Sequence, residues 1–246
     1  MTEAYPIIRD LGLCAKLVSF AVAFEDAANK AALAFAAAVE AQAWDGVEEV
    51  STSLVSTAIR FDPLRLDPEL LEEKLNTILR ARDWQAATPP EGRKLWRIPV
   101  VIDEEHGAQF AQAAKLVNLS QKEAKTEILN SRVRVLTLGF APGQPYMGIL
   151  PAHWNFPRMS ELNPQVPGGA LVTAIGQLII YAGPAPTGWR HLGQTAFECF
   201  RPSSKTPIAL TPGDEVTFVE ATPEELKDIK ETDTSGDGGA TWEPIT

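Results

Sequence analysis

The sequence predicts an α+β protein built from two consecutive domains. Two observations lead to this prediction. Over its first hundred residues the chain alternates strand-like and helix-like segments, and beyond Arg132 it changes to short β-rich runs separated by Gly and Pro clusters. The first pattern is typical of a sheet covered by helices, and the second is typical of a β-barrel or β-sandwich.

The N-terminal segments follow one another in the order strand, helix, strand, strand, helix, strand. Residues 11–20 are strand-like, and an alanine-rich helix is predicted from Glu25 to Trp44. Residues 47–62 alternate polar and apolar side chains over two strands. A second helix is expected after Asp67, an N-cap residue followed by Pro68 at the first helical position.

Residues 94–102 complete this series after a linker at Pro89–Gly92, and they fit on either side of that linker. With this strand included, the order is that of a ferredoxin-like split β-α-β sandwich. We therefore predict a small α/β domain over residues 1–90 and a β-barrel domain over residues 91–226. The remaining residues, 227–246, are polar, glycine-rich and acidic, and we expect most of them to be mobile.

The second half opens with a helical pattern from Glu104 to Leu129. Within it, Ser120 and Glu123 have the S-x-x-E spacing of a capping box. The β-rich runs that follow are VRVLTLGF, ALVTAIG, QLIIYAG, RHLGQT, AFECF and EVTFVEA. Short strands at such close intervals favour a barrel or sandwich.

The composition excludes several classes of function. The chain has 246 residues and a formal net charge of −10. Its basic residues form no stripe, which argues against a nucleic-acid partner because phosphate binding needs clustered Lys and Arg. The apolar run LVSFAVAF is far too short to span a membrane, and the N-terminus shows no secretory pattern. We therefore expect a cytoplasmic protein.

No metal site is expected in this chain. Cys14 and Cys199 lie far apart in apolar surroundings, so both are expected to be buried thiols. The three histidines, His106, His153 and His191, have no metal-ligand spacing with each other or with a cysteine.

The stretch LGFAPGQPYMGIL stands out because it concentrates Gly, Pro, aromatic and amide residues directly after a strand-like run. Pro142-Gly143 sets one bend and Pro145 restricts the residues that follow, so a stiff loop at a strand end would display Gln144 and Tyr146. The alternative is an ordinary barrel turn in which Phe140 and Tyr146 pack into the core.

Other candidate groups carry weaker signals. The sequence contains neither the GxxxxGK[ST] phosphate loop nor the GxSxG nucleophile elbow. Glu104, Glu105 and His106 are adjacent, but neighbours on a helix point apart, and acids are common at a helix start. Arg158 either clamps a carboxylate or bridges loops, and His191 alternates with apolar residues as in a barrel strand. We assign no nucleophile or general base.

Five motifs occur in an order and spacing that resemble one family. They are LGFAPGQPYMGIL, FPR, VPGGALVTAIGQLIIY, PTGWRHLGQT and LTPGDEVTF. The chain resembles the family of B-type subunits of 5-oxoprolinase, also called allophanate hydrolase subunit 1 or the carboxyltransferase-domain C/D family. This family includes a sporulation kinase inhibitor. The resemblance is strong between Leu138 and Phe218 and mainly architectural before that.

The resemblance implies a cyclophilin-like β-barrel for the second domain and a second cyclophilin-like subunit as partner. The implied reaction is hydrolysis of a small amide or ureide, either 5-oxoproline opened to glutamate with ATP use or allophanate. No cofactor is expected on this chain, and further subunits would consume the ATP. We predict a hydrolase subunit that is inactive alone. The alternatives are a regulatory binding protein of the kinase-inhibitor type and a stand-alone small-molecule-binding module.

The family's site residues carry over only where its motifs match. The positions that the resemblance places around a substrate pocket are Pro142, Gly143, Gln144, Pro145, Tyr146, Arg158, Gln177, Tyr181 and Trp189. In this hypothesis Arg158 orients a carboxylate, while Gln177, Tyr146 and Trp189 shape the pocket.

Four positions depart from the family pattern. Gln144 stands where the family usually has an aromatic residue, and Thr187 takes the place of a glycine. Asn163 and Gln194 stand where the family has arginines. The loss of two cations would weaken a site for an anionic substrate, so we expect a divergent member with an altered substrate or one that mainly binds.

Overall fold

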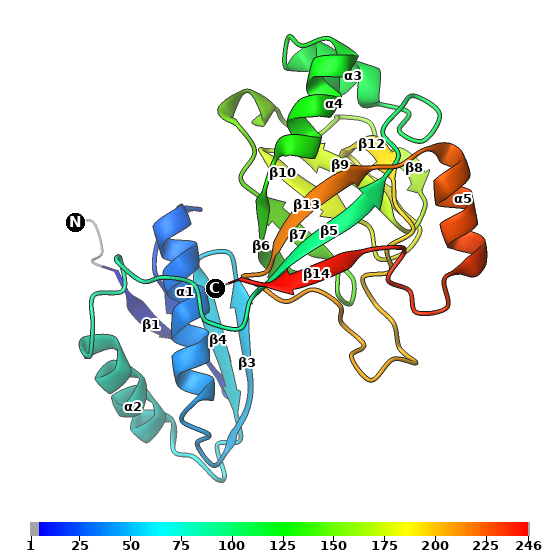
Figure 1. Cartoon of the computed structure of the whole chain (residues 1–246). Helices are drawn as coiled ribbons and strands as arrows, with labels where there is room; N and C mark the ends of the chain where they lie inside the picture. The colour runs from blue at the N-terminus through cyan, green and yellow to red at the C-terminus, as the bar shows by residue number, and fades with distance from the viewer. Residues whose placement is uncertain (1–4, 246) are drawn as a thin grey trace. The chain divides into compact units, whose positions relative to one another are not determined.

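The computed structural model describes residues 5–245, which divide into two compact units between Glu91 and Gly92 (Figure 1). Each unit has its own hydrophobic core. No helix of the described part is both long enough and apolar enough to cross a bilayer.

The first unit is a four-stranded antiparallel sheet with two helices. Its elements are β1 (Ile7–Asp10), β2 (Ala15–Ser19), α1 (Asp26–Glu40), β3 (Val47–Ser53), β4 (Ser56–Phe61) and α2 (Pro68–Arg80). The strand order is β1-β2-β4-β3, so β4 lies between β2 and β3. The segment β2-α1-β3 is therefore a split β-α-β unit.

The fourth strand of this sheet differs from the sequence prediction. The edge position beside β2 is taken by β1, which the sequence analysis did not predict, and residues 94–102 are absent from the sheet. Because β1 and β2 form a hairpin, residues 11–14 are a turn and the exposed Cys14 is not the buried thiol expected. Cys199 is buried, and that burial raises its pKa to about 12.

Each helix of this unit buries one apolar face. The buried residues of α1 include five alanines along with Phe35, whose ring packs edge-on against Trp84 at 5.2 Å. The Asp67 carboxylate accepts hydrogen bonds from the first turn of α2, which confirms the predicted N-cap. Leu71 and Leu75 enter the core, whereas Leu70 lies outside it.

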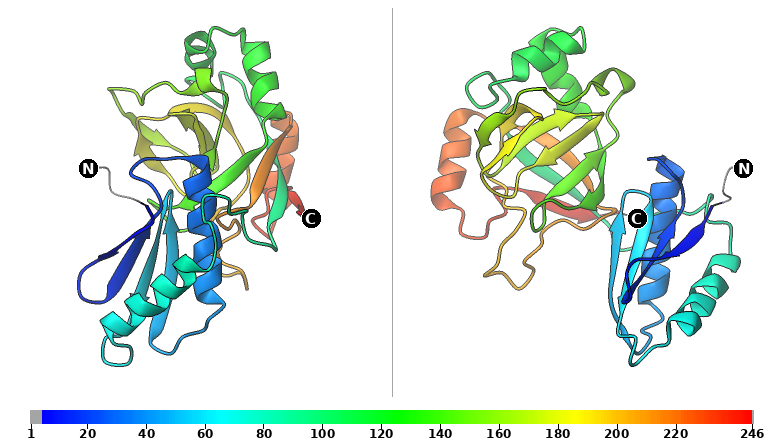
Figure 2. Two further views of the ribbon diagram at one scale, coloured as in Figure 1. Left: turned by 90° about the vertical axis from the view of Figure 1, so that its left-hand side faces the viewer. Right: turned by 180° about the vertical axis from the view of Figure 1, so that it is seen from behind.

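The second unit is a barrel. Its strands are β5 (Lys94–Val100), β6 (Val133–Leu138), β7 (Pro145–Gly148), β8 (Asn163–Val166), β9 (Ala170–Ala174), β10 (Gln177–Ile180), β11 (Ala185–Thr187), β12 (Arg190–Gln194), β13 (Glu215–Glu220) and β14 (Thr241–Pro244). The main sheet has the order β12-β9-β10-β7-β6-β13-β5-β14 and curves round on itself (Figure 2). Two hydrogen bonds of 2.9 Å between Val101 and Gln194 close it between the end of β5 and β12.

Helices flank the barrel. They are α3 (Phe110–Leu116), α4 (Gln121–Asn130), α5 (Pro223–Thr232) and the short η1 (Ala152–Trp154). The predicted capping box of Ser120 and Glu123 is confirmed at the start of α4. The helical pattern predicted over 104–129 forms two helices, the second of which begins at this capping box. The first begins only at Phe110, because residues 103–109 form turns in which the Asp103 carboxylate accepts from the backbone N–H of His106.

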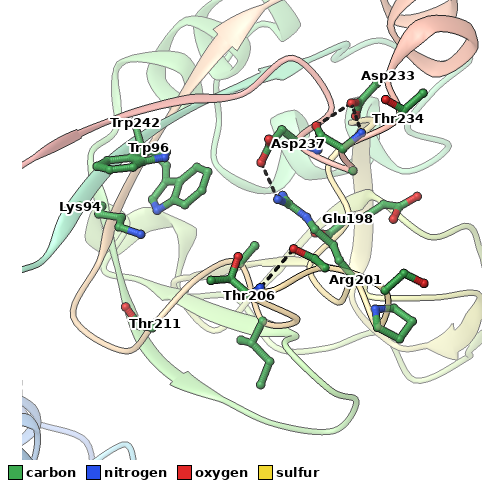
Figure 3. A pocket seen from close by; sticks show the side chains of 17 residues that line it. Lys94, Trp96, Glu198, Arg201, Thr206, Thr211, Asp233, Thr234, Asp237 and Trp242 are labelled. Atoms are coloured by element: carbon green, nitrogen blue, oxygen red, sulfur yellow. Dashed lines mark hydrogen bonds and ion pairs between the residues drawn. The ribbon is translucent and has the colours of Figure 1, made fainter.

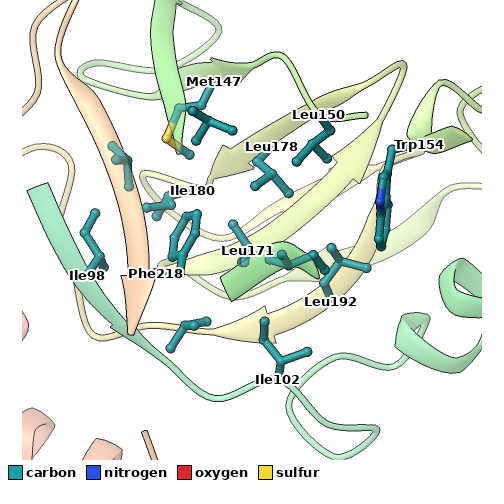
Figure 4. Packing of buried hydrophobic residues seen from close by; sticks show 14 of the residues in the cluster. Ile98, Ile102, Met147, Leu150, Trp154, Leu171, Leu178, Ile180, Leu192 and Phe218 are labelled. Atoms are coloured by element: carbon teal, nitrogen blue, oxygen red, sulfur yellow. The ribbon is translucent and has the colours of Figure 1, made fainter. Parts of the chain in front are cut away.

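The two faces of the barrel wall carry separate apolar clusters. The interior cluster contains Leu171, Leu178 and Met147, all without solvent exposure (Figure 4). Alternate residues such as Val172 and Ile179 point to the other face, where they pack with Val166 and Ala185 of the small β8–β11 sheet. That outer face positions the candidate site.

The structure also differs from the prediction of a mobile tail over 227–246. Most of α5 and all of β14 fall within it, and a Thr222–Glu225 capping box begins the helix. Strand β14 pairs antiparallel with β5, and Pro244 lies on the edge of the sheet, where a missing N–H costs little. The polar composition of residues 227–246 does not indicate strand β14, because the strand with which it pairs, β5, lies far away in the sequence.

Candidate functional site

The loop between β6 and β7 contains the centre of the LGFAPGQPYMGIL stretch. The N–H of Gln144 donates to the Ala141 carbonyl at 3.1 Å, with Pro142 and Gly143 at the two central positions. Gly143 has a φ of 70°, so the turn has the sequence and conformation of a type II turn. A Cβ on Gly143 would lie 2.4 Å from the Cys199 carbonyl oxygen, so only glycine fits.

The loop is therefore a stiff turn, and each of the two predictions for it holds in part. Tyr146 packs against a buried apolar cluster whereas Phe140 does not, and Gln144 is buried rather than displayed. Phe140 is 72% exposed and lies 6.3 Å, centre to centre, from the Tyr181 ring. Pro142 is exposed, whereas Pro145 is buried and begins β7.

Several predicted site residues meet on the outer face of the barrel wall. Tyr146 pairs with Ile179 across β7 and β10, which sets Gln144 and Tyr181 on the same face. The Tyr146 ring meets Trp189 edge-on at 6.0 Å, and the Arg158 guanidinium carbon lies 5.2 Å from the Trp189 ring centre. We call the set Gln144, Tyr146, Arg158, Tyr181 and Trp189 the tyrosine cluster.

The surroundings of the central hydroxyl, that of Tyr146, raise its pKa above the ordinary value for tyrosine. Burial raises the pKa of Tyr146 and the nearby Tyr181 adds to that effect, whereas Arg158 and Gln144 oppose it. A protonated phenol donates one hydrogen bond, and Arg158, which is exposed, retains its guanidinium donors. The cluster thus presents a cation and a neutral donor beside an indole ring.

Gln144 has an incomplete set of hydrogen bonds. It is 1% exposed, and its Oε1 accepts from the Ala182 N–H at 3.3 Å. Its Nε2 is buried and has no partner with hydrogen-bond geometry within residues 5–245. Such a buried donor is costly unless an acceptor meets it, and the Tyr146 hydroxyl, whose pKa the Gln144 side chain lowers, is the acceptor beside it.

Glycine allows the FPR and GW motifs to approach each other. The N–H of Met159 donates to the Gly188 carbonyl at 2.7 Å, and a Cβ on Gly188 would lie 3.1 Å from the Met159 carbonyl oxygen. This contact brings Arg158 to Trp189. Gln177 shares the face of Ile179 and Tyr181 but begins β10, next to the turn at residues 175–176, and it is not part of the cluster.

A second group of polar residues lies outside the predicted set. The Asp103 carboxylate accepts from both the backbone N–H and, at 2.9 Å, the ring Nδ1 of His106. Burial would raise the pKa of Asp103, but these hydrogen bonds outweigh it and lower the pKa. Burial lowers the pKa of His191, and the neighbouring His106 lowers it further. The hydrogen bond between the His191 ring and the Gly193 carbonyl acts in the opposite direction but does not outweigh them. The three-residue spacing of Asp103 and His106 is the sequence signal from which this contact could have been predicted.

Neither group forms a metal site. Within the described residues, no three His, Cys, Asp or Glu side chains gather in a way that could hold an ion. The cavity of about 910 Å³ in the same unit is lined by other residues, and none of the predicted pocket residues contributes to it.

The sequence of this chain is similar to those of known proteins. Residues 6–210 match the family model described as carboxyltransferase domain, subdomain C and D. The chain belongs to this carboxyltransferase-domain family. It is 29% identical over 238 residues to the B-type subunit of 5-oxoprolinase from Bacillus subtilis (strain 168), covering 94% of this chain and 99% of that protein. It is 36% identical over 156 residues to the corresponding 5-oxoprolinase subunit from Escherichia coli O157:H7, covering 62% and 70%.

Two solved structures share the fold of this chain. The crystal structure of TTHA0988 superposes with a TM-score of 0.72 at 29% identity over 88% of this chain. This chain spans only 40% of that protein. The Kluyveromyces lactis urea amidolyase has a TM-score of 0.72 at 18% identity, covering 97% of this chain and 16% of that protein, a likeness of fold alone.

Two departures from the family pattern have local partners in this structure. Asn163 exchanges two hydrogen bonds of 2.9 and 3.0 Å with the Gln109 amide, whose Oε1 also accepts from the His191 N–H. Gln194 donates at 2.8 Å to the carbonyls of Gly168 and Thr195. Neutral amides that bond to neutral groups thus occupy the two positions at which the resemblance led us to expect arginine.

The third departure also has a local role. The Thr187 hydroxyl accepts from the Trp189 N–H at 3.0 Å, which fixes the backbone before the indole of the tyrosine cluster. Gln144 is the departure whose side chain lacks a complete set of partners within residues 5–245.

Proposed function

We propose that this chain is a subunit of a heteromeric amidohydrolase that opens 5-oxoproline to glutamate with consumption of ATP. The match to a 5-oxoprolinase subunit over nearly the full length of both chains supports the reaction class. The observation in this chain that supports a role in substrate binding is the exposed Arg158 held against Trp189 and beside Tyr146.

The chemistry of 5-oxoproline suits the tyrosine cluster. The molecule is a flat five-membered lactam that carries one carboxylate. An arginine fork binds a carboxylate through two parallel hydrogen bonds, so Arg158 would orient the substrate. The Tyr146 hydroxyl would donate to the lactam carbonyl, and the buried Trp189 would hold Tyr146 and Arg158 in place beneath the substrate.

The proposed partner is a second, cyclophilin-like barrel subunit. We assign this chain no nucleophile and no general base, so the partner subunits would supply the catalytic groups and use the ATP. The chain alone would then be inactive. Its contribution would be to bind and orient the substrate.

The test is to purify the chain together with the products of its neighbouring genes. We expect co-purification with a barrel-type subunit and ATP-dependent release of glutamate from 5-oxoproline. Allophanate serves as the second substrate in the same assay, and turnover of allophanate alone would replace 5-oxoproline as the substrate. Absence of both association and turnover of either compound would refute the proposal.

One variant tests whether the tyrosine cluster contributes to substrate binding. Arg158→Met should raise the KM for 5-oxoproline by about tenfold or more, because one charge-assisted contact is lost. The matched control is Arg80→Met, at the exposed end of α2, which should leave KM unchanged. An unchanged KM in Arg158→Met would remove Arg158 from the substrate site.

A further inference from the structure

A cavity of about 910 Å³ lies in the barrel unit, away from the tyrosine cluster (Figure 3). Lys94 and Trp96 of β5 and Trp242 of β14 form one wall. The other walls come from the loop between Glu198 and Thr211 and from residues 233–237. Both tryptophans lie on the Lys94 side of the open space in Figure 3, and Arg201 lies across from them.

The cavity combines the family domain with a segment outside the family match. That match ends at residue 210, whereas residues 233–237 and Trp242 lie beyond it. The segment is firmly held, because the Glu198 N–H donates to the Gly236 carbonyl at 2.9 Å. A Cβ on Gly238 would lie 2.4 Å from the Phe197 nitrogen, so the chain passes there as closely as glycine allows.

Arg201 is buried at the edge of the cavity with one end unsatisfied. Its Nε donates to the Glu198 carbonyl at 2.9 Å, its Nη1 pairs with Asp237 at 2.5 Å, and its guanidinium stacks on Phe197. Its Nη2 has no hydrogen-bond partner in the described chain. A guanidinium with a buried free donor is satisfied best by an anionic oxygen.

Lys94 supplies a second cation with a free ammonium group. Its Nζ lies 4.5 Å from the Trp242 ring centre and 5.8 Å from the Trp96 ring centre. Among residues 5–245 no carboxylate forms an ion pair with it, and in Figure 3 the amine points toward the open centre. Cation–π contacts leave the N–H donors of an ammonium available to a ligand.

The acidic residues of the cavity are already engaged or turned away. Asp237 pairs with Arg201, and Asp233 accepts hydrogen bonds from Ser235 and Gly238. The Glu198 carboxylate lies on the side of Arg201 that faces away from Lys94 (Figure 3). The acids thus leave the ammonium of Lys94 and the unpartnered Nη2 of Arg201, which lie across the open space from each other, as the groups available to an anion.

We propose that this cavity binds a small molecule that carries a carboxylate or phosphate group. Lys94 and Arg201 are the donors to its anionic oxygens, and Trp242 is the wall for its body. The site is separate from the tyrosine cluster and does not depend on the proposed hydrolase activity.

The test uses two anions on the intact chain. Sodium phosphate and sodium glutarate are titrated by calorimetry at a constant ionic strength set with sodium chloride, and the two salts distinguish a phosphate ligand from a carboxylate ligand. We expect saturable binding of at least one of them. Binding that does not saturate for either anion overturns the proposal.

Three variants make the test specific. Lys94→Met should weaken binding about tenfold or more, since one charge-assisted contact is lost. Lys205→Met, in the same loop region but outside the lining, is the matched control and should bind as the unmodified chain does. Asp237→Asn removes the charge that competes for Arg201 and should tighten binding. Equal affinities in Lys94→Met and Lys205→Met would overturn the proposal even if an anion binds.

Discussion

The wall made by β7, β10 and β9 has two faces that differ in what they bury. The inner face buries Met147, Leu178 and Leu171 completely among other apolar side chains. The outer face also has an apolar floor, but it places Tyr146, Gln144 and the neighbouring Arg158 at its border. The same strands therefore stabilise the barrel with apolar side chains on one side and carry polar side chains on the other.

This difference follows from the period-2 geometry of strands. Neighbouring residues such as Tyr146 and Met147 point to opposite faces, so one strand can satisfy both demands. We expect substitutions on the inner face to change stability, and substitutions at the border of the outer face to change binding. The following experiments test that contrast.

The largest effect should come from the inner face. Leu178→Ala would leave a cavity in a fully buried cluster and should lower the free energy of unfolding by about 2–5 kcal/mol. Urea denaturation monitored by circular dichroism measures this. A loss below about 1 kcal/mol would show that the interior is loosely packed.

The turn that supports the site should be next. Gly143→Ala forces a Cβ toward the Cys199 carbonyl at a positive φ, and should cost about 3 kcal/mol or more. Gly176→Ala is the matched control, because Gly176 has nearly the same φ of 71° and open space around its Cβ position. The control should cost about 1 kcal/mol. Equal losses would mean that the Cys199 contact is unimportant.

The outer face should respond in function and hardly in stability. Tyr146→Phe removes one hydroxyl from a half-buried ring and should change the free energy of unfolding by less than about 1 kcal/mol. In the assembled complex, turnover of 5-oxoproline at low substrate concentration should fall up to about tenfold. Unchanged turnover in this variant would restrict the site to Arg158 and Trp189.

The smallest effect should be a pH dependence outside both faces. The pKa of Asp103 is lowered in the folded chain, so its ionised form stabilises the fold above the unfolded value near 3.8, and this contribution is lost as the pH falls through the folded pKa. Asp103→Asn should therefore lower the thermal midpoint slightly at pH 6 and by less at pH 3. A constant difference across this range would contradict the assignment.

The local signals in the sequence were read correctly where near neighbours decide the structure. The Asp67 N-cap and the Ser120–Glu123 capping box are contacts within one helical turn, so their residue types are enough to predict them. The β-rich character of the second half and the family were also evident from short motifs. These features depend on residues that lie close together in the sequence.

Tertiary structure decided the features that depend on distant partners. Strand β5 joins the barrel because β13 and β14, more than a hundred residues later, pair with it. The meeting of Tyr146, Arg158 and Trp189 needs the register of β7 with β10 and the close approach of Gly188 to Met159. Pairing and packing between distant segments leave no periodic trace in one sequence, so the motifs alone suggested a set of candidate residues but did not show which of them touch.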